Sequence, residues 1–249
     1  MADTGTIYDL FGFTHTGSKR PYNQDRILVQ DKILDRQSYG LELQKSCQAF
    51  VADGVGGLPA GEKAARILLE GIQQSINGGP VSAGMLNRIF GELNQKLFAF
   101  GEAEPQSRGL ATTLVGLFLD EEGELTLLNV GDSEAWLFRA GNLEKLTEDH
   151  VLDRDQPNSP ITQYFGGKED HLQVSYYPQF AYAEEEDIFL LCSDGLRKSL
   201  SESSISEILS HTQSLSAKGN QLLQDALEAG APDNISVILI YVAQLPPIS

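Results

Sequence analysis

The chain has 249 residues, of which 41% are apolar, so it can form one large domain or two small ones with an ordinary hydrophobic core. Its formal net charge of −17 argues against binding to nucleic acid or to anionic membrane surfaces, because both depend on clustered Lys and Arg. The composition therefore favours a globular protein whose partners are not polyanions.

Two isolated cysteines, Cys47 and Cys192, lie in apolar strand-like runs, which predicts buried and reduced thiols. The N-terminus has neither the basic start nor the apolar segment of a signal peptide. No apolar run approaches the ~18 residues of a membrane span. We therefore expect a soluble protein of the cytoplasm.

Up to residue 100, short strands precede two long helices. Residues 7–14, 26–30 and 47–52 have the apolar, β-type composition of strands. Apolar residues then recur at helical spacing in 62–76 and 85–100, with an Asn-Gly-Gly-Pro turn after the first of these segments. This order predicts a sheet with two helices packed on it.

From residue 111 the chain is rich in predicted strands, with one long polar loop and two further helices. The predicted strands are 111–120, 125–132, 133–141, 171–177, 187–194 and 234–242; the loop is 147–170; the helices are 203–211 and 215–229. Because the regular alternation of a doubly wound sheet is missing, we expect an α+β fold. It should have two antiparallel sheets with helices outside, in a single domain spanning 1–249.

Asp53 ends an apolar strand and is followed by a loop with four glycines and a proline. The loop fails as a dinucleotide fingerprint, because Pro59 stands where the third glycine is needed. It also fails as a phosphate-binding P-loop, because Glu62 and Lys63 follow Gly61 instead of a lysine and a hydroxyl residue. The remaining hypothesis is that Asp53 itself is the reagent and that glycines let backbone and ligand approach it.

An aspartate beside a turn-forming residue at the end of an apolar strand recurs along the chain. Asp53, Asp132 and Asp194 follow strands, Asp233 precedes one, and Asp25 opens one. Each alone is typical of a turn or a helix cap. If these strand ends share one edge, however, the carboxylates converge and repel each other, and a cation has to compensate. Oxygen ligands without a His or Cys cluster indicate Mg²⁺ or Mn²⁺ rather than zinc.

Six motifs, which together span nearly the whole chain, carry a resemblance to a known family. They are RPYNQD at 20–25, VADGVGGLPAGE at 51–62, GLATTLVG at 109–116, NVGDSEAWLFRAGNLEKLTEDH at 129–150, LLCSDGL at 190–196 and PDNISVILI at 232–240. In this order they resemble the metal-dependent protein serine/threonine phosphatases (the PPM family, protein phosphatase type 2C) in their compact bacterial form. The resemblance implies a four-layer α-β-β-α sandwich, in which pairs of helices flank two antiparallel sheets and a dinuclear Mn²⁺ or Mg²⁺ centre lies at one end.

The resemblance also implies how the metals are held. Asp53 would bridge the two ions, with the carbonyl of Gly54 on one of them. Asp194 and Asp233 would be ligands of the first ion. Asp132 would bind a third, weaker metal that shares Asp194.

Arg20 and Asp25 match the remaining functional positions of the family. Arg20 would grip the substrate phosphate, a task that suits its bidentate guanidinium. Asp25 would act on metal-bound water or serve as a ligand. The implied reaction is attack of a water or hydroxide that bridges the two metals on phosphoserine or phosphothreonine in proteins. The implied substrates are those of a cognate kinase, and the enzyme is expected to be a monomer.

Several positions depart from the family pattern. Val55 and Leu58 stand where relatives carry histidine, and Gln24 replaces a glutamate of some relatives. Residues 150–165 are short compared with the flap of bacterial members. These departures leave the group that protonates the leaving alkoxide unassigned. Two other functions therefore stay open: a pseudophosphatase or phosphoprotein-binding module with weak turnover, and a nucleotide-binding protein built on the loop 54–63.

Overall fold

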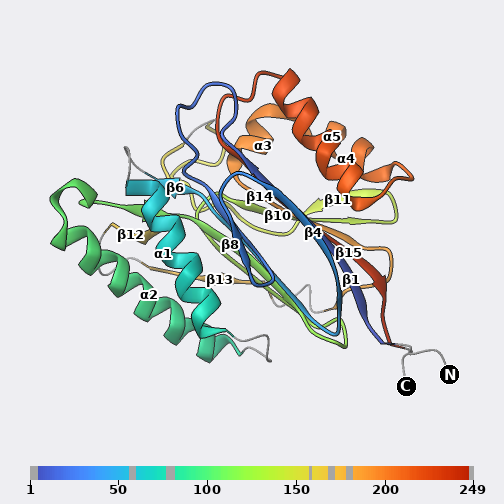
Figure 1. Ribbon diagram of the computed structural model, residues 1–249, viewed down its shortest axis with the longest axis horizontal. Coiled ribbons are helices and arrows are strands. Elements are labelled where there is room, and N and C mark those ends of the chain that lie inside the picture. The colour runs from blue at the N-terminus through green and yellow to red at the C-terminus, as the bar shows by residue number, and fades with distance from the viewer. Residues whose placement is uncertain are drawn as a thin grey trace.

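The computed structural model of the chain describes residues 5–55, 60–76, 82–156, 159–167, 172–177 and 182–246. These residues form two six-stranded antiparallel sheets that lie face to face, with helices on both outer sides (Figure 1). The strand order is β11-β10-β14-β15-β1-β4 in the first sheet and β13-β9-β8-β5-β2-β3 in the second. The α-β-β-α sandwich predicted from the sequence is therefore confirmed.

Most strands are short. The first sheet contains β1 (Ile7–His15), β4 (Ser38–Gln44), β10 (Glu134–Arg139), β11 (Asn142–Lys145), β14 (Ile188–Cys192) and β15 (Ile235–Gln244). The second contains β2 (Arg26–Val29), β3 (Lys32–Leu34), β5 (Cys47–Ala52), β8 (Leu114–Leu119), β9 (Leu125–Val130) and β13 (Ser175–Tyr176). A small third sheet joins β12 (Phe165–Gly166), β7 (Ala111–Thr112) and β6 (Gly54–Val55).

The core between the two large sheets is apolar and tightly packed. Inward-facing side chains of both sheets, among them Tyr8, Leu117 and Ile240, are almost completely buried there. The sheets approach each other closely at Gly12 of β1, where a Cβ atom would lie 2.8 Å from Cγ2 of Val29. The strands β5, β8 and β14 are buried along their whole length, because their successive side chains alternate between this core and the outer face that the helices cover.

Helices cover the outer faces of both sheets. On the second sheet lie α1 (Ala60–Ser75) and α2 (Ala83–Ala103), followed by a short 3₁₀ helix, η1 (Pro105–Ser107). On the first sheet lie α3 (Asp194–Ser199), α4 (Glu202–Ser210) and α5 (Leu215–Glu228). The helices α2, α4 and α5 each begin after a serine whose hydroxyl accepts a backbone N–H three residues later, at Ser82, Ser201 and Ser214.

Several details differ from the sequence-based expectation. The short helix α3 is added to the predicted pair on its side of the sandwich. No strand was expected in 31–46, 54–55 or 142–145, yet β3 and β4, β6, and β11 lie in these ranges. The predicted loop 147–170 contains β12, and within residues 172–177, the described part of the predicted strand 171–177, only Ser175–Tyr176 is a strand. β3 and β12 have only three and two residues, too few to show a period-two pattern, so the sequence could not predict them. β4 has seven residues with apolar side chains at Tyr39, Leu41 and Leu43, so its period-two pattern was present in the sequence and was missed.

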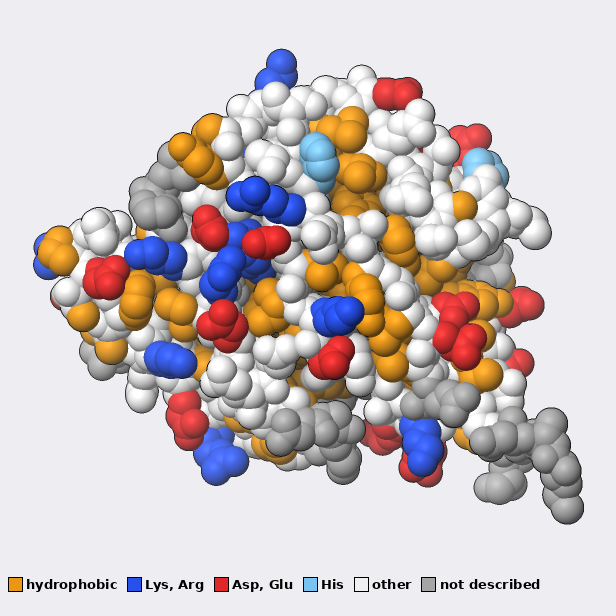
Figure 2. All heavy atoms as spheres, viewed as in Figure 1, with side chains coloured by type: hydrophobic (Ala, Val, Ile, Leu, Met, Phe, Trp, Pro, Cys, Tyr) orange, Lys and Arg blue, Asp and Glu red, His pale blue; other side chains and the backbone are white. Residues whose placement is uncertain are grey.

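The state of the cysteines and the distribution of surface charge agree with what the composition predicts. Cys47 and Cys192 are buried, free cysteines, as predicted. Figure 2 shows acidic and basic side chains interspersed on the face in view, without an extended basic area on its described part. Among the helices of the described residues, none is both long and apolar enough to cross a membrane.

The strand ends that carry the predicted site lie at one end of the sandwich. The first residue of β2, Arg26, pairs with Ala52 at the end of β5, so Asp25 and Asp53 lie beside each other. At the end of β14, Cys192 pairs with Val237 near the start of β15, which brings Asp194 and Asp233 to the same region. The predicted convergence of strand ends is therefore a consequence of antiparallel register.

Candidate active site

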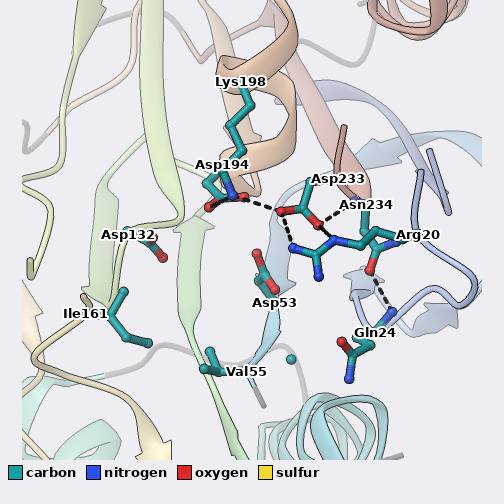
Figure 3. Close-up of a pocket in the computed structure, with 11 residues that line it drawn as sticks. Arg20, Gln24, Asp53, Val55, Asp132, Ile161, Asp194, Lys198, Asp233 and Asn234 are labelled. Carbon is teal, nitrogen blue, oxygen red and sulfur yellow. Dashed lines mark hydrogen bonds and ion pairs between the residues drawn. The ribbon is translucent and has the colours of Figure 1, made fainter. Parts of the chain in front are cut away.

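A cavity of about 210 Å³ opens where these strand ends meet (Figure 3). Its lining includes every predicted site residue except Asp25, namely Arg20, Asp53, Gly54, Asp132, Asp194 and Asp233. Figure 3 shows the four lining aspartates on different elements but around the same space. Asp25 is fully buried beside them. We call the five aspartates, Asp25, Asp53, Asp132, Asp194 and Asp233, the aspartate cluster.

The position of Asp53 is fixed through its backbone. Its carbonyl accepts hydrogen bonds from the Thr113 N–H and the Thr112 hydroxyl, both at 2.9 Å, and its own N–H donates to Oγ1 of Thr113 at 3.1 Å. The Asp53 carboxylate takes no part in these backbone contacts, and Asp53 lines the cavity. Burial and then the charges of Asp25 and Asp194 raise the pKa of Asp53 well above its usual range. The two threonines are positioning residues that the sequence pattern did not indicate.

Asp25 has one paired and one unpaired carboxylate oxygen. Its Oδ2 accepts hydrogen bonds from the hydroxyls of Ser193 at 2.8 Å and Ser236 at 2.7 Å. Its Oδ1 is buried without a hydrogen-bond partner among the described residues. Burial raises the pKa of Asp25 to about 6, although the two serine hydroxyls oppose that shift. A buried, unpaired carboxylate oxygen is costly, which indicates a missing cationic partner.

Asp132 and Asp194 also carry raised pKa values. Burial and then the charge of Asp194 raise the pKa of Asp132 to about 7. Burial likewise raises the pKa of Asp194, although the nearby Lys198 ammonium opposes it. The cluster thus holds more negative charge than its surroundings can stabilise.

Two basic side chains partly neutralise the cluster. Arg20 forms a two-pronged ion pair with Asp233, with Nε 2.8 Å from Oδ1 and Nη2 2.9 Å from Oδ2. Nζ of Lys198 lies 2.5 Å from Oδ2 of Asp194 and 2.8 Å from Oδ2 of Asp233. Burial alone would raise the pKa of Asp233, but these hydrogen bonds lower it. The sequence analysis did not single out Lys198, although its spacing of four residues from Asp194 within a helix was an available signal.

Close backbone contacts hold the loops of the site together. The Asn234 side chain accepts a hydrogen bond from the Gln24 N–H at 2.9 Å. It also donates hydrogen bonds to the backbone carbonyls of Thr16 at 2.8 Å and Tyr22 at 2.9 Å. A Cβ atom on Gly54 would lie 2.3 Å from the Gly61 carbonyl group, so this contact requires glycine. Residues 56–59, including Leu58, lie outside the described part of the chain.

His150 is engaged away from the cavity. Its Nδ1 accepts the Gly131 N–H at 3.1 Å, so the ring proton lies on Nε2, which is 2.9 Å from the Ser175 hydroxyl. Burial lowers the pKa of His150, which favours this neutral ring. Val55 lines the cavity, and no described residue in that lining is a histidine. The described lining therefore offers no imidazole to protonate a leaving group.

The donor set fits hard divalent cations. Carboxylates and backbone carbonyls are the ligands that Mg²⁺ and Mn²⁺ prefer, and the unpaired Oδ1 of Asp25 supplies a ready ligand atom. As placed, the described His, Cys, Asp and Glu residues contain no group of three or more at ligand spacing. Arg20 and Lys198 instead hold the carboxylate oxygens of Asp194 and Asp233 in ion pairs.

The raised pKa values predict how the metal-free protein responds to pH. Between about pH 4 and pH 7 the folded cluster binds more protons than the unfolded chain, so stability falls as pH rises through this window. In excess chelator, the free energy of unfolding in urea should be higher at pH 5 than at pH 8 by on the order of 2 kcal/mol.

Asp132→Asn removes one of these titrating groups and should make the pH profile flatter than that of the wild type. Comparison of the two profiles cancels the titration of residues elsewhere in the chain. Identical profiles would show that Asp132 does not titrate in this window.

Comparison with known protein families gives one match over most of the chain. A family model described as protein phosphatase 2C matches residues 22–239. Serine/threonine phosphatase stp of Listeria welshimeri is 29% identical over 212 residues, which cover 77% of this chain and 82% of that protein. Serine/threonine protein phosphatase PstP of Mycobacterium tuberculosis is 27% identical over 206 residues, which cover 77% of this chain and 40% of the relative.

Solved structures show the same architecture. PppA, described as a key regulatory component of T6SS in Pseudomonas aeruginosa, aligns with a TM-score of 0.79 and 27% identity over 94% of this chain and 97% of that one. The catalytic domain of PstP in complex with two manganese ions aligns with a TM-score of 0.78 and 25% identity over 96% and 100% of the two chains. The likeness extends over almost the whole sandwich.

Proposed function

This chain belongs to the protein phosphatase 2C family and is a serine/threonine protein phosphatase, and we propose that hydrolysis takes place at the aspartate cluster. The observation that carries this assignment is the convergence of four aspartates from separate strand ends on one cavity, with a fifth buried beside them. Four of the five, Asp25, Asp53, Asp132 and Asp194, have raised pKa values, which is typical of a site built to hold cations.

Metal dependence belongs to the family, and we propose Mn²⁺ or Mg²⁺ as the ions of this chain, two per molecule. Asp53, the Gly54 carbonyl, Asp194 and Asp233 would hold them, and Asp132 would contribute to a third, weaker site. Such ions lower the pKa of water and neutralise the charge that develops during in-line displacement at phosphorus.

The protein's own residues have separate tasks in this proposal. Asp25 contributes Oδ1, as a ligand or as the acceptor of a proton from the attacking water, and both uses need this oxygen unpaired, as it is here. The hydroxyls of Ser193 and Ser236 hold the other oxygen and so orient the carboxylate. The threonines beside Asp53 fix its backbone, so the reacting groups keep their geometry without rearrangement.

Arg20 is suited to bind the substrate phosphate. Its side chain lies at the mouth of the cavity and is 52% exposed, and its guanidinium already forms a two-pronged contact with a carboxylate. A phosphate group offers the same pair of oxygen acceptors. In the proposed complex, Arg20 would exchange Asp233 for the phosphate.

Substitution of Arg20 tests whether substrate binds in this cavity. Arg20→Ala should raise KM for a phosphothreonine peptide by about tenfold or more, because charge-assisted hydrogen bonds to the phosphate are lost. Arg20→Lys should restore only part of the affinity, because lysine keeps the positive charge but cannot donate two parallel hydrogen bonds to the phosphate.

Arg108→Ala is a suitable control, because Arg108 is also exposed but does not line the cavity. Its KM should equal that of the wild type. A wild-type KM for Arg20→Ala would place the substrate elsewhere.

The biological setting is also a proposal. We propose that the substrates are phosphoserine and phosphothreonine proteins modified by a cognate kinase, in bacterial signal transduction. The buried, free state of Cys47 and Cys192 supports a reducing compartment, and we propose the cytoplasm. A single catalytic domain that acts as a monomer is the simplest form of this proposal.

A further inference from the structure

Lys198 occupies an unusual position within the aspartate cluster. Its ammonium lies between two carboxylates of different elements, 2.5 Å from Asp194 at the start of α3 and 2.8 Å from Asp233 just before β15 (Figure 3). Its side chain is 30% exposed and lines the cavity. Within the described residues, Lys198 is the one basic side chain that forms ion pairs with both Asp194 and Asp233.

We propose that Lys198 is a built-in competitor for the divalent cation. Its ammonium lies between Asp194 and Asp233, so binding of a metal ion by these two carboxylates has to displace it. This inference rests on the proposed function, because it assumes that these two carboxylates bind metal.

The charges around Lys198 indicate that it does more than form an ordinary surface ion pair. A pair of residues four apart on an exposed helix contributes little to stability, but Lys198 makes its second contact with Asp233, 35 residues away. Without a cation, the two carboxylates would repel each other. The ammonium therefore stabilises the metal-free site and at the same time opposes metal entry, because entry breaks two charge-assisted hydrogen bonds.

Arg20 cannot substitute for Lys198 in this role. Its guanidinium pairs with Asp233 but forms no ion pair with Asp194. A larger groove of about 740 Å³ adjoins the cavity, and Lys198 lines this groove as well. The groove gives the displaced ammonium a polar place to go, so displacement does not require α3 to unfold.

Lys145 provides a matched control. Its ammonium also bridges two carboxylates, 2.7 Å from both Glu134 and Asp149, and its side chain is 28% exposed. Neither carboxylate belongs to the aspartate cluster. Removal of Lys145 should therefore change stability without changing the affinity for metal.

Calorimetric titration of the metal-stripped full chain with Mn²⁺ tests the inference. Lys198→Met and Lys198→Gln should each bind Mn²⁺ roughly tenfold more tightly than the wild type or better, because the metal no longer displaces an ammonium. Their melting temperatures in excess chelator should be lower than that of the wild type. Lys145→Met should also melt earlier but keep the wild-type Kd.

A Kd for both Lys198 variants that is unchanged or weaker would overturn the inference. If the wild type still required Mn²⁺ for phosphate release in that case, the proposed function would stand without it. If the wild type bound no Mn²⁺ at all, the proposed function would be wrong and the inference with it.

Discussion

Replacement of Asp53 by Asn should abolish activity and yet stabilise the metal-free protein. The amide has the shape of the carboxylate but no charge, so it would be a much poorer ligand for the divalent cations that Asp53 is proposed to hold, and several kcal/mol of transition-state stabilisation should disappear. We expect kcat to fall by about 10³-fold or more. In excess chelator at pH 8, urea unfolding should show a higher free energy, because a neutral amide avoids the burial cost and the carboxylate repulsion that raise the pKa of Asp53.

Asp187→Asn is the control for Asp53→Asn, because it also removes a buried carboxylate but lies outside the aspartate cluster. Asp187 is 1% exposed, and its two oxygens accept hydrogen bonds from Arg139 at 2.7 and 2.6 Å. Its replacement should lower stability, because the buried carboxylate that holds the half-buried Arg139 is lost, and leave kcat unchanged. Wild-type turnover by Asp53→Asn would show that the reaction does not use this cluster.

Gly54→Ala should damage both the fold around the site and the reaction. The added methyl group would lie 2.3 Å from the Gly61 carbonyl group and 2.7 Å from the Gln24 carbonyl oxygen, so the backbone of β6 or α1 has to move. We expect a loss of about 1–3 kcal/mol of stability from this overpacking. A shift of about 1 Å in the neighbouring Asp53 should cost roughly 100-fold in kcat.

Gly91→Ala is the control for a glycine substitution that meets no obstacle. Gly91 lies within α2, and a Cβ atom there has nothing within 4 Å. This variant should gain roughly 0.5–1 kcal/mol, since alanine favours the helix, and keep its activity. Equal urea midpoints for Gly54→Ala and the wild type would contradict the close contact between β6 and α1.

The parts of the site that sequence reasoning could predict are those with a local signal. Asp53, Asp132 and Asp194 each follow an apolar strand and precede a turn-forming or small residue, so their place at strand ends was readable without a structure. Antiparallel pairing then brings such ends together, as it does for Arg26 and Ala52. The two-sheet fold was predictable for the same reason, since strand and helix periodicities are local properties.

The contacts that tune the site were not predictable, because they join distant parts of the chain. Ser236 reaches Asp25 across 211 positions, and Arg20 reaches Asp233 across 213. The sequence predicted that Arg20 binds the substrate phosphate, but it did not indicate that Arg20 pairs with the Asp233 carboxylate. Lys198 was missed because a lysine on a short helix is ordinary until its second partner, Asp233, is known.

The most direct test of the account measures inorganic phosphate released from a phosphothreonine peptide by the metal-stripped full chain. The account predicts no turnover in excess chelator and full turnover after Mn²⁺ is restored, because the aspartate cluster needs cations to bind phosphate and activate water. Mg²⁺ in place of Mn²⁺ should support the same reaction, at a rate that the experiment would determine. Undiminished phosphate release in excess chelator would contradict the central claim that this phosphatase works through metal ions held by the aspartate cluster.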